Sequence, residues 1–223
     1  MSRIIVIGGH GKVARKLLPM LVEAGHEAVA VIRRPEHAEA VAELGATPLV
    51  ADLEQLDMEG IAKLLVGDDV VVWSAGAGGG DPDRTYAVDR DAAIRSFEAA
   101  NHAGARRYLM VSYLGAGPDH GVPEDHSFFP YAEAKAATDQ ALAQSGLDWT
   151  ILMPTTLSDE PGAGMIAAGP GAPQGAAVSR EDVARVIAAC IERDDQIHRY
   201  VPFAAGGTPI DEALDEALRE PQG

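Results

Sequence analysis

The amino-acid sequence predicts an α/β protein built on a doubly wound parallel sheet. Short apolar runs of strand length alternate with segments of helical period along most of the chain. The runs lack polar alternation, which is typical of parallel strands that are buried on both faces. A glycine-rich turn follows the first run, at residues 8–11. Sustained alternation of this kind predicts helices on both sides of a parallel sheet, in a single domain with a minimal C-terminal elaboration.

Each expected element is identified by its apolar pattern and bounded by turn residues. Runs of β-branched and aromatic residues predict strands at 4–7, 28–32, 47–50, 70–73, 107–111, 149–153 and 198–203. Apolar positions at helical spacing predict helices at 12–24, 36–44, 57–65, 83–102, 131–144, 180–193 and 210–218, with Ser179 as the N-cap of the sixth. One domain spans 1–223, and its elaboration comprises 158–178 and 195–223. The stretch 158–178 is rich in Gly, Ala and Pro, and we expect it to be irregular and mobile.

Composition excludes several functional classes. The 223 residues include 34 acidic and 18 basic side chains, which gives a formal net charge of −16. We expect no binding to nucleic acid or to an anionic membrane, because both require a cationic surface. No apolar run reaches the roughly 18 residues of a membrane span, and the first residues do not resemble a secretory signal. The single cysteine, Cys190, cannot form an internal disulfide, which agrees with the reducing cytoplasm in which we expect the protein.

The turn Gly8-Gly9-His10-Gly11 connects the first strand to the first helix. Backbone N–H groups and the positive end of the helix can bind a diphosphate there, and glycine permits close approach. The spacing is G-x-x-G-x-x-A rather than the usual G-x-G-x-x-G, and a turn that needs glycine only for its conformation is the alternative. The residues expected to contact the diphosphate are Gly8, His10, Gly11, Lys12 and Val13.

The ends of the next two strands carry polar residues that indicate which dinucleotide binds. Arg33 and Arg34 follow the second strand, where an arginine accommodates the 2′-phosphate of NADP and an acidic residue would accept from the 2′-hydroxyl of NAD. NADP is therefore favoured and NAD is less favoured, although a solvated arginine pair is the alternative. Asp52 follows the third strand and is placed to accept from the adenine amino group, with a turn cap as the alternative.

Three residues form a candidate catalytic set. Tyr131 and Lys135 are four residues apart, so they share one face of the expected helix. A free phenol has a pKa near 10, and a neighbouring ammonium together with an oxidised nicotinamide would favour its phenolate form. Lys135 can also hold the hydroxyls of the nicotinamide ribose. Ser112, at the end of the fifth strand, can donate to a substrate carbonyl, with Tyr131 as the general acid.

Taken together, these motifs resemble the atypical branch of the short-chain dehydrogenase/reductase superfamily. Its members include small NAD(P)-binding proteins of the epimerase/dehydratase-like, NmrA-like and flavin-reductase-like types. The resemblance covers nearly the whole chain and implies a Rossmann fold. It implies that Asp52 and Leu53 contact the adenine side, and that Asp89 occupies a position where such proteins often place an Asn or Asp. The other cofactor contacts that it implies are Ser74, Ala75 and Gly76 near the adenine side and the diphosphate, and Pro154, Thr155 and Leu157 near the nicotinamide.

The sequence also departs from the family pattern. Ser112 and Tyr131 are 19 residues apart, a longer interval than in the classical branch. The intervening loop, 113–130, is expected to overhang the nicotinamide as a substrate wall or lid. Its histidines, His120 and His126, match no zinc template, so no metal is expected. The sugar-nucleotide epimerases of the family carry a larger C-terminal substrate domain than this chain has after its sixth strand.

The sequence thus favours an NADP-dependent oxidoreductase that acts on a small carbonyl, quinone or flavin-like acceptor. A non-enzymatic NADP-binding redox sensor that signals to a protein partner is the alternative, and an NAD-dependent epimerase or dehydratase is a weaker one. The expected partners are the dinucleotide and an unidentified small-molecule substrate. The oligomeric alternatives are a monomer and a homodimer.

Overall fold

The computed structural model describes residues 1–78 and 81–219. Gly79 and Gly80, in the glycine-rich stretch after the fourth expected strand, lie outside the described residues. So do residues 220–223, the end of the range expected for the domain and its elaboration.

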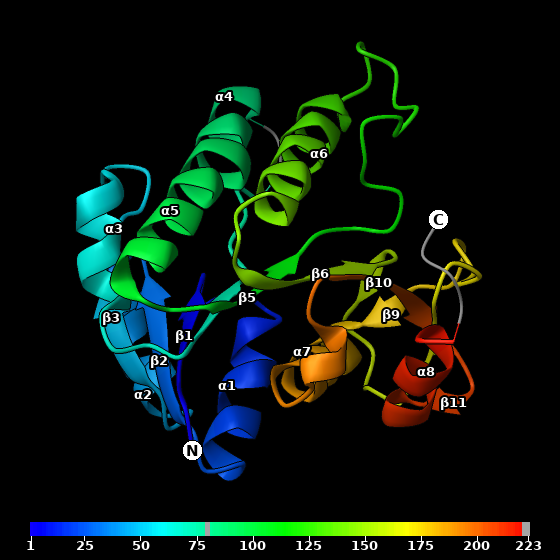
Figure 1. Ribbon diagram of the computed structural model, residues 1–223, viewed down its shortest axis with the longest axis horizontal. Helices are drawn as coiled ribbons and strands as arrows, with labels where there is room; N and C mark the ends of the chain where they lie inside the picture. Colours follow the sequence, from blue (N-terminus) through cyan, green and yellow to red (C-terminus); the bar gives the residue numbers. More distant parts are fainter. Residues whose placement is uncertain (79–80, 220–223) are drawn as a thin grey trace.

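A nine-stranded sheet runs through the centre of the molecule (Figure 1), in the order β11-β8-β10-β6-β5-β4-β1-β2-β3. The parallel strands are β1 (Arg3–Ile7), β2 (Glu27–Ile32), β3 (Thr47–Val50), β4 (Val70–Trp73), β5 (Arg107–Val111), β6 (Asp148–Pro154) and β10 (Arg199–Ala205). Two antiparallel strands, β8 (Met165–Ala168) and β11 (Thr208–Pro209), extend the sheet beyond β10. A separate parallel pair is formed by β7 (Leu157–Ser158) and β9 (Val178–Ser179). The strand order, which reverses between β1 and β4, confirms the predicted doubly wound Rossmann fold.

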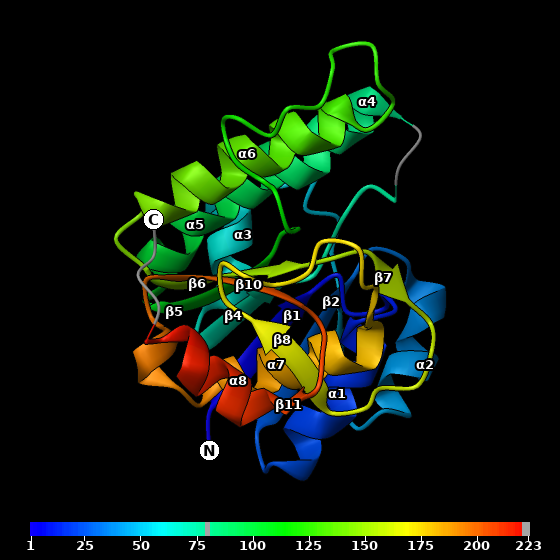
Figure 2. The same cartoon turned by 90° about the vertical axis from the view of Figure 1, so that its right-hand side faces the viewer.

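Helices cover both faces of the sheet (Figures 1 and 2). One face carries α3 (Met58–Leu65), α4 (Pro82–Thr85), α5 (Ala93–Ala103) and α6 (Phe129–Ala143). The other carries α1 (Ala14–Glu23), α2 (Ala38–Ala42), α7 (Arg180–Ile191) and α8 (Ile210–Ala217). Shorter helical segments are η1 (Pro35–His37), the π-helical η2 (Tyr86–Ala92) and η3 (Asp194–Gln196). Among the described residues, no helix has the length and hydropathy that a membrane crossing requires.

The hydrophobic core has two parts, one on each face of the sheet. Ile4 and Val6 of β1 belong to a cluster with side chains of α1 and α7. Ile5 and Ile7 belong to a second cluster with side chains of α3 and α5. Successive side chains of a strand point to opposite faces. Because both faces are covered, the strands need apolar residues at every position, which explains the runs without polar alternation.

The elements expected from the sequence are present. Strands β3, β4 and β5 have the expected bounds, and the other four parallel strands differ by a residue or two at their ends. Ser179 caps α7 as expected, because its side chain accepts a hydrogen bond from the backbone N–H of Asp182. The long helix expected at 83–102 contains a π-helical segment, η2, between α4 and α5.

The expectation that 158–178 is irregular is wrong for part of the stretch, whereas 159–164 and 169–177 contain no helix or strand. This stretch contains β8, which pairs with β10 through Phe203↔Ala168 and Ala205↔Ile166. Ile166 is fully buried in the core beside α1 and α7. The sequence signal is weak because β8 has only four residues, two of them alanine, and its partner lies much later in the chain.

Candidate functional site

Two cavities lie along one edge of the sheet, where the parallel strands end. The first has a volume of about 360 Å³ and is lined by the segments that follow β1, β2, β3 and β4. The second has a volume of about 400 Å³ and is lined by the segments that follow β5 and β6, together with the start of α6. Since β4 and β5 are neighbours in the sheet, the two cavities are adjacent along this edge. Ligands of open α/β sheets bind at this edge, near the position where the strand order reverses.

The first cavity brings together most of the residues expected to bind the cofactor. Its lining includes Gly8, His10, Gly11, Arg33, Arg34, Asp52, Leu53, Ser74, Ala75 and Gly76. Two of the residues expected to contact the diphosphate, Lys12 and Val13, are not in this lining. Lys12 is exposed, with its Nζ 2.6 Å from Oδ2 of Asp159, and Val13 packs in the core beside α1. Their contacts with a cofactor remain predictions.

The glycine turn lies directly against its neighbouring strands. Gly8 has a φ of +84°, and a Cβ at this position would lie 2.6 Å from Cα of Ala75. A Cβ at Gly9 would lie 2.5 Å from Cβ of Ala30. Close packing against neighbouring segments of the chain thus explains why Gly8 and Gly9 have no side chain. The turn leads into α1, whose N-cap Val13 provides no side-chain hydrogen bond. N–H groups at such a helix start are available to an anion, so the turn fits the diphosphate of a dinucleotide.

His10 stacks on a residue that the sequence patterns did not indicate. Its ring lies 3.6 Å from that of His37, with an angle of 10° between the ring planes. Partial burial, His37 and Arg15 lower the pKa of His10, which favours its neutral form. His37 lies in η1 and also lines the first cavity. No sequence motif marks it, because the stacking joins the glycine turn to the segment after β2.

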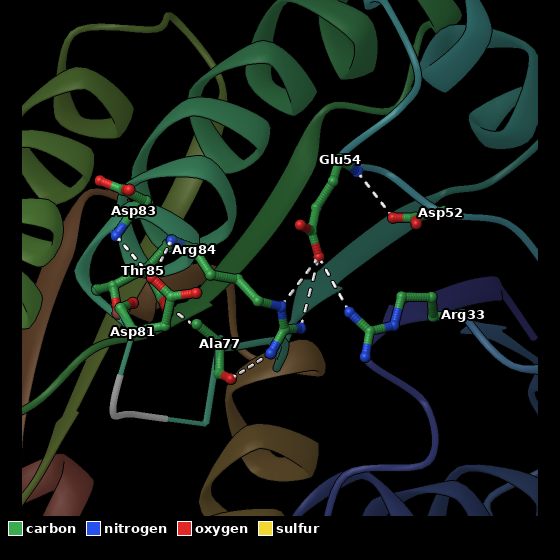
Figure 3. A network of polar contacts seen from close by, with 9 residues as sticks. Arg33, Asp52, Glu54, Ala77, Asp81, Asp83, Arg84 and Thr85 are labelled. Carbon is green, nitrogen blue, oxygen red and sulfur yellow. Dashed lines mark hydrogen bonds and ion pairs between the residues drawn. The ribbon is translucent and has the colours of Figure 1, made fainter.

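The strand-end arginine Arg33 belongs to a network of charges in the first cavity (Figure 3). Its Nη1 lies 3.1 Å from Oε1 of Glu54, and Nε of Arg84 lies 3.4 Å from the same oxygen. Nη1 of Arg84 also donates to the carbonyl oxygen of Ala77, at 2.6 Å. Asp52 accepts a hydrogen bond from the backbone N–H of Glu54, at 3.1 Å, so the turn-cap role considered for Asp52 is present. The sequence patterns did not indicate Glu54 or Arg84.

The second cavity contains two members of the candidate catalytic set, Ser112 and Tyr131. The ring of Tyr131 lies 5.7 Å from that of Tyr113 and 5.2 Å from that of Phe128, so three aromatic rings form one wall. Its lining also includes the residues expected near the nicotinamide, which are Pro154, Thr155 and Leu157. Tyr113 and Phe128 lie at the two ends of the loop 113–130, which therefore contributes to the cavity wall. Its movement as a lid remains a prediction.

Lys135, the third member of the set, lies behind the cavity. It is only 1% exposed, and its Nζ donates to the carbonyl oxygen of Val111 at 2.9 Å. The carboxylate of Asp89 is also buried and accepts a hydrogen bond from the backbone N–H of Ala77, at 2.9 Å. Burial raises the pKa of Asp89, and the charge of Lys135 opposes that shift. Lys135 is thus an internal positive charge among buried carboxylates.

The groups around Tyr131 favour its neutral phenol. Burial is the largest cause of the raised pKa of Tyr131, and the nearby Asp89 and Asp139 carboxylates add to it. The expected shift toward the phenolate also included the charge of an oxidised nicotinamide; among the protein's own groups, burial and the two carboxylates dominate. A neutral phenol has a proton to donate, so the arrangement fits a general acid.

Asp139 is a buried carboxyl group that the sequence patterns did not indicate. It lies one turn after Lys135 on α6, and its Oδ2 accepts a hydrogen bond from the hydroxyl of Ser112. Burial raises the pKa of Asp139 to about 6, against the opposing effects of Lys135 and of the bond from Ser112. The spacing of four residues from Lys135 is a signal that could have identified it.

Among the described residues, no group of three or more His, Cys, Asp and Glu side chains is arranged to hold a metal ion. In the loop 113–130, His120 forms a hydrogen bond of 2.8 Å with Glu133.

Comparison with known proteins identifies the class of ligand. The chain matches the sequence model of a family described as NAD(P)H-binding, over residues 8–194. The uncharacterized sugar epimerase YhfK of Bacillus subtilis is 34% identical over 214 residues, covering 95% of this chain and 98% of that protein. The UPF0659 protein C216.03 of Schizosaccharomyces pombe is 34% identical over 233 residues, covering 96% of this chain and 94% of that protein.

Solved structures agree with this assignment. A candidate NAD-dependent epimerase/dehydratase from Bacillus halodurans has a TM-score of 0.89 at 33% identity, covering 97% of this chain and 100% of that one. The oxidoreductase ylbE from Lactococcus lactis, with a TM-score of 0.84 at 24% identity and 99% of each chain covered, shares the fold. The first cavity, with its close glycine turn and its strand-end arginines, fits a dinucleotide. The chain therefore belongs to the NAD(P)H-binding family, which confirms the cofactor class and the Rossmann fold implied by its motifs.

Proposed function

We propose that the protein is an NADP-dependent oxidoreductase of the atypical short-chain dehydrogenase/reductase type, which reduces a small carbonyl, quinone or flavin-like acceptor. One observation carries the proposal. A dinucleotide cavity that contains Arg33 and Arg34 adjoins a second cavity whose lining includes the phenol of Tyr131 and the hydroxyl of Ser112. The cofactor, when bound, supplies a hydride. The protein must then supply a proton and a binding site for the acceptor.

The proton comes from Tyr131 in this proposal. Its phenol is neutral and lies in the lining of the second cavity, where it can donate to the oxygen of a reduced carbonyl or quinone. Lys135 is too deeply buried to touch an acceptor, so it acts on Tyr131 and on the nearby carboxylates through its charge. Once Tyr131 has lost its proton, the ammonium of Lys135 stabilises the resulting phenolate.

Whether Ser112 can donate a hydrogen bond to the substrate depends on the protonation state of Asp139. A hydroxyl has a single proton, and that of Ser112 is directed to Oδ2 of Asp139. While Asp139 is ionised, the Ser112 hydroxyl has no proton left for the substrate and can only accept a hydrogen bond from it. When Asp139 is protonated, it can donate to Ser112, whose own proton then becomes available to a carbonyl oxygen. Hydride transfer should therefore be faster below the pKa of Asp139, which is about 6.

The walls of the second cavity favour a flat, uncharged acceptor. Tyr113, Phe128 and Tyr131 supply aromatic surface, and the remaining polar side chains of the lining are neutral. None of its described lining residues is Lys or Arg, which a nucleotide sugar would need for its diphosphate. Planar quinones and flavins match such a cavity best.

An epimerase or dehydratase is the second candidate, because YhfK and the Bacillus halodurans protein bear such descriptions at 34% and 33% identity. An enzyme of this kind would oxidise and re-reduce its substrate on the same bound cofactor. It would convert a nucleotide sugar with no net consumption of NADPH. The absence of basic side chains from the described lining of the second cavity favours the reductase.

The test is a titration with NADPH and NADH, followed by a screen of quinones, flavins and aldehydes for NADPH oxidation. We expect tighter binding of NADPH and turnover of at least one planar acceptor. The Tyr131→Phe variant should retain its affinity for NADPH and lose about 100-fold or more in kcat, because it lacks the proton of the general acid. Unchanged turnover in this variant would remove Tyr131 from the mechanism. Tight NADPH binding with no turnover of any acceptor would instead support the redox sensor, and conversion of nucleotide sugars would support the epimerase.

A further inference from the structure

Glu54 holds two arginines that come from different parts of the chain (Figure 3). Its Oε1 lies 3.1 Å from Nη1 of Arg33, at the end of β2, and 3.4 Å from both Nε and Nη2 of Arg84, on α4. All three side chains line the first cavity. The carboxylate is the least exposed of the three, with 21% of its side-chain surface accessible. Glu54 therefore lies between two guanidinium groups inside the region where the dinucleotide binds.

The donors that Glu54 occupies are those that a phosphate group needs. A phosphate monoester carries close to two negative charges at neutral pH and is bound best by more than one guanidinium. One carboxylate paired with Arg33 and Arg84 leaves a local charge of only +1, and a phosphate brought to these arginines would meet the charge of Glu54. Like charges at close range repel, so the carboxylate and the phosphate compete for the same donors.

We propose that Glu54 is a specificity-determining residue of the cofactor site, which opposes the 2′-phosphate by occupying Arg33 and Arg84. Binding of NADP then releases these arginines from Glu54, and Arg84 becomes a second arginine for the phosphate beside Arg33. This inference rests on the proposed preference for NADP. The strand-end pattern pointed only to Arg33 and Arg34, whereas Arg84 reaches the same cavity from α4.

The position of Arg84 is fixed independently of Glu54. Its Nη1 donates to the carbonyl oxygen of Ala77 at 2.6 Å, and its backbone N–H donates to the N-cap residue Asp81. The guanidinium therefore keeps its place when Glu54 is neutralised. A Glu54→Gln variant retains the size of the side chain and one oxygen that can accept from the arginines, while it removes the charge and replaces the second oxygen with an NH2 donor.

The decisive measurement is calorimetric titration of the wild type and of Glu54→Gln with NADPH, NADH, 2′,5′-ADP and 5′-AMP. We expect the variant to bind NADPH and 2′,5′-ADP about three- to tenfold more tightly, and to bind NADH and 5′-AMP within about twofold of the wild type. The gain should shrink at high salt, since the competition is electrostatic. The Arg84→Met variant should weaken NADPH and 2′,5′-ADP selectively, and Arg84→Lys should restore part of the loss.

Glu27→Gln is the matched control. Glu27 also pairs with an arginine at 3.1 Å, Arg3, but at the start of β1 and β2 and thus at the opposite edge of the sheet. Its substitution should leave every affinity unchanged. The inference is overturned if Glu54→Gln binds NADPH no more tightly than the wild type does. A wild type that binds 2′,5′-ADP no more tightly than 5′-AMP would refute the NADP preference itself, which is a separate and distinguishable result.

Discussion

Asp139 is buried beside the Ser112 hydroxyl, and its second carboxylate oxygen, Oδ1, has no hydrogen-bond partner among the described residues. Burial raises its pKa from 3.8 to about 6 in the folded protein. The folded state therefore binds this proton more tightly than the unfolded state does, and the associated stability is fully present below pH 4 and lost as the pH rises to about 6. Asp139→Asn should remove that loss and raise the free energy of unfolding at pH 7 by up to about 3 kcal/mol.

Urea unfolding of the wild type and of Asp139→Asn between pH 4 and pH 7 measures this effect. The wild type should lose stability across that interval relative to the variant. Asp119→Asn changes an exposed carboxylate in the loop 113–130 and should leave the pH dependence as it is in the wild type. If the free energies of unfolding of the wild type and of Asp139→Asn changed in parallel with pH, the ionisation of a buried Asp139 at neutral pH would be contradicted.

Short spacings made some residues of the candidate site predictable. The pair Tyr131 and Lys135 and the strand-end Ser112 could be identified because helical periodicity and strand ends are local features of the sequence. Glu54 and Arg84 could not, since they meet across 30 residues of chain and belong to no shared motif. The raised pKa of Tyr131 could not be predicted for a related reason: it depends on burial and on Asp89 and Asp139, which only the fold brings close.

At the scale of elements, the C-terminal strands depend on one close backbone contact. Residues 206 and 207 join β10 to β11, and these two strands pair with opposite sides of β8. A Cβ at Gly206 would lie 2.3 Å from the backbone nitrogen of Ala167. Gly206→Ala must therefore move β8 away from its partners, and it should lower the free energy of unfolding by about 1–3 kcal/mol.

Its neighbour supplies the control. A Cβ at Gly207 would meet no atom of residues 1–78 or 81–219 within 4 Å, so Gly207→Ala should be close to neutral. Thermal and urea unfolding of both variants measures the difference. Equal stability of the two variants would show that β8 can shift at no cost and would contradict the tight packing of this edge.

Elements were predictable where burial on both faces produced continuous apolar runs. The strands β3, β4 and β5 have the bounds expected from the sequence for that reason. The strand β8 was missed because it is short, alanine-rich and stabilised by pairing with β10 rather than by its own composition. The π-helical turn of η2 was also missed, since its hydrogen-bond pattern has no signature in the spacing of apolar residues.

At the scale of the whole molecule, a single sheet connects the proposed cofactor site to both halves of the core. β1 contributes alternate side chains to the two clusters, and the first cavity opens where β1, β2 and β4 end. Neither half of the core can unfold without exposing strands that the other half needs. We therefore expect one cooperative unfolding transition. A cofactor that binds only the folded state should stabilise the whole molecule against this transition.

This coupling predicts a shift of the entire transition by NADPH. At a concentration of 100 times its Kd, a ligand that binds only the folded state adds about 2.7 kcal/mol, which corresponds to about 5–10 °C in Tm for a chain of this size. Scanning calorimetry with increasing NADPH should show one peak that moves without splitting. An Arg33→Met variant should unfold near the wild-type temperature without ligand, because Arg33 has 40% of its side chain exposed and a partly solvated ion pair with Glu54 adds little stability, and it should shift less at the same NADPH concentration. A second peak that NADPH leaves in place would mean that part of the sheet unfolds independently of the cofactor site, and the molecule would then not be a single cooperative unit.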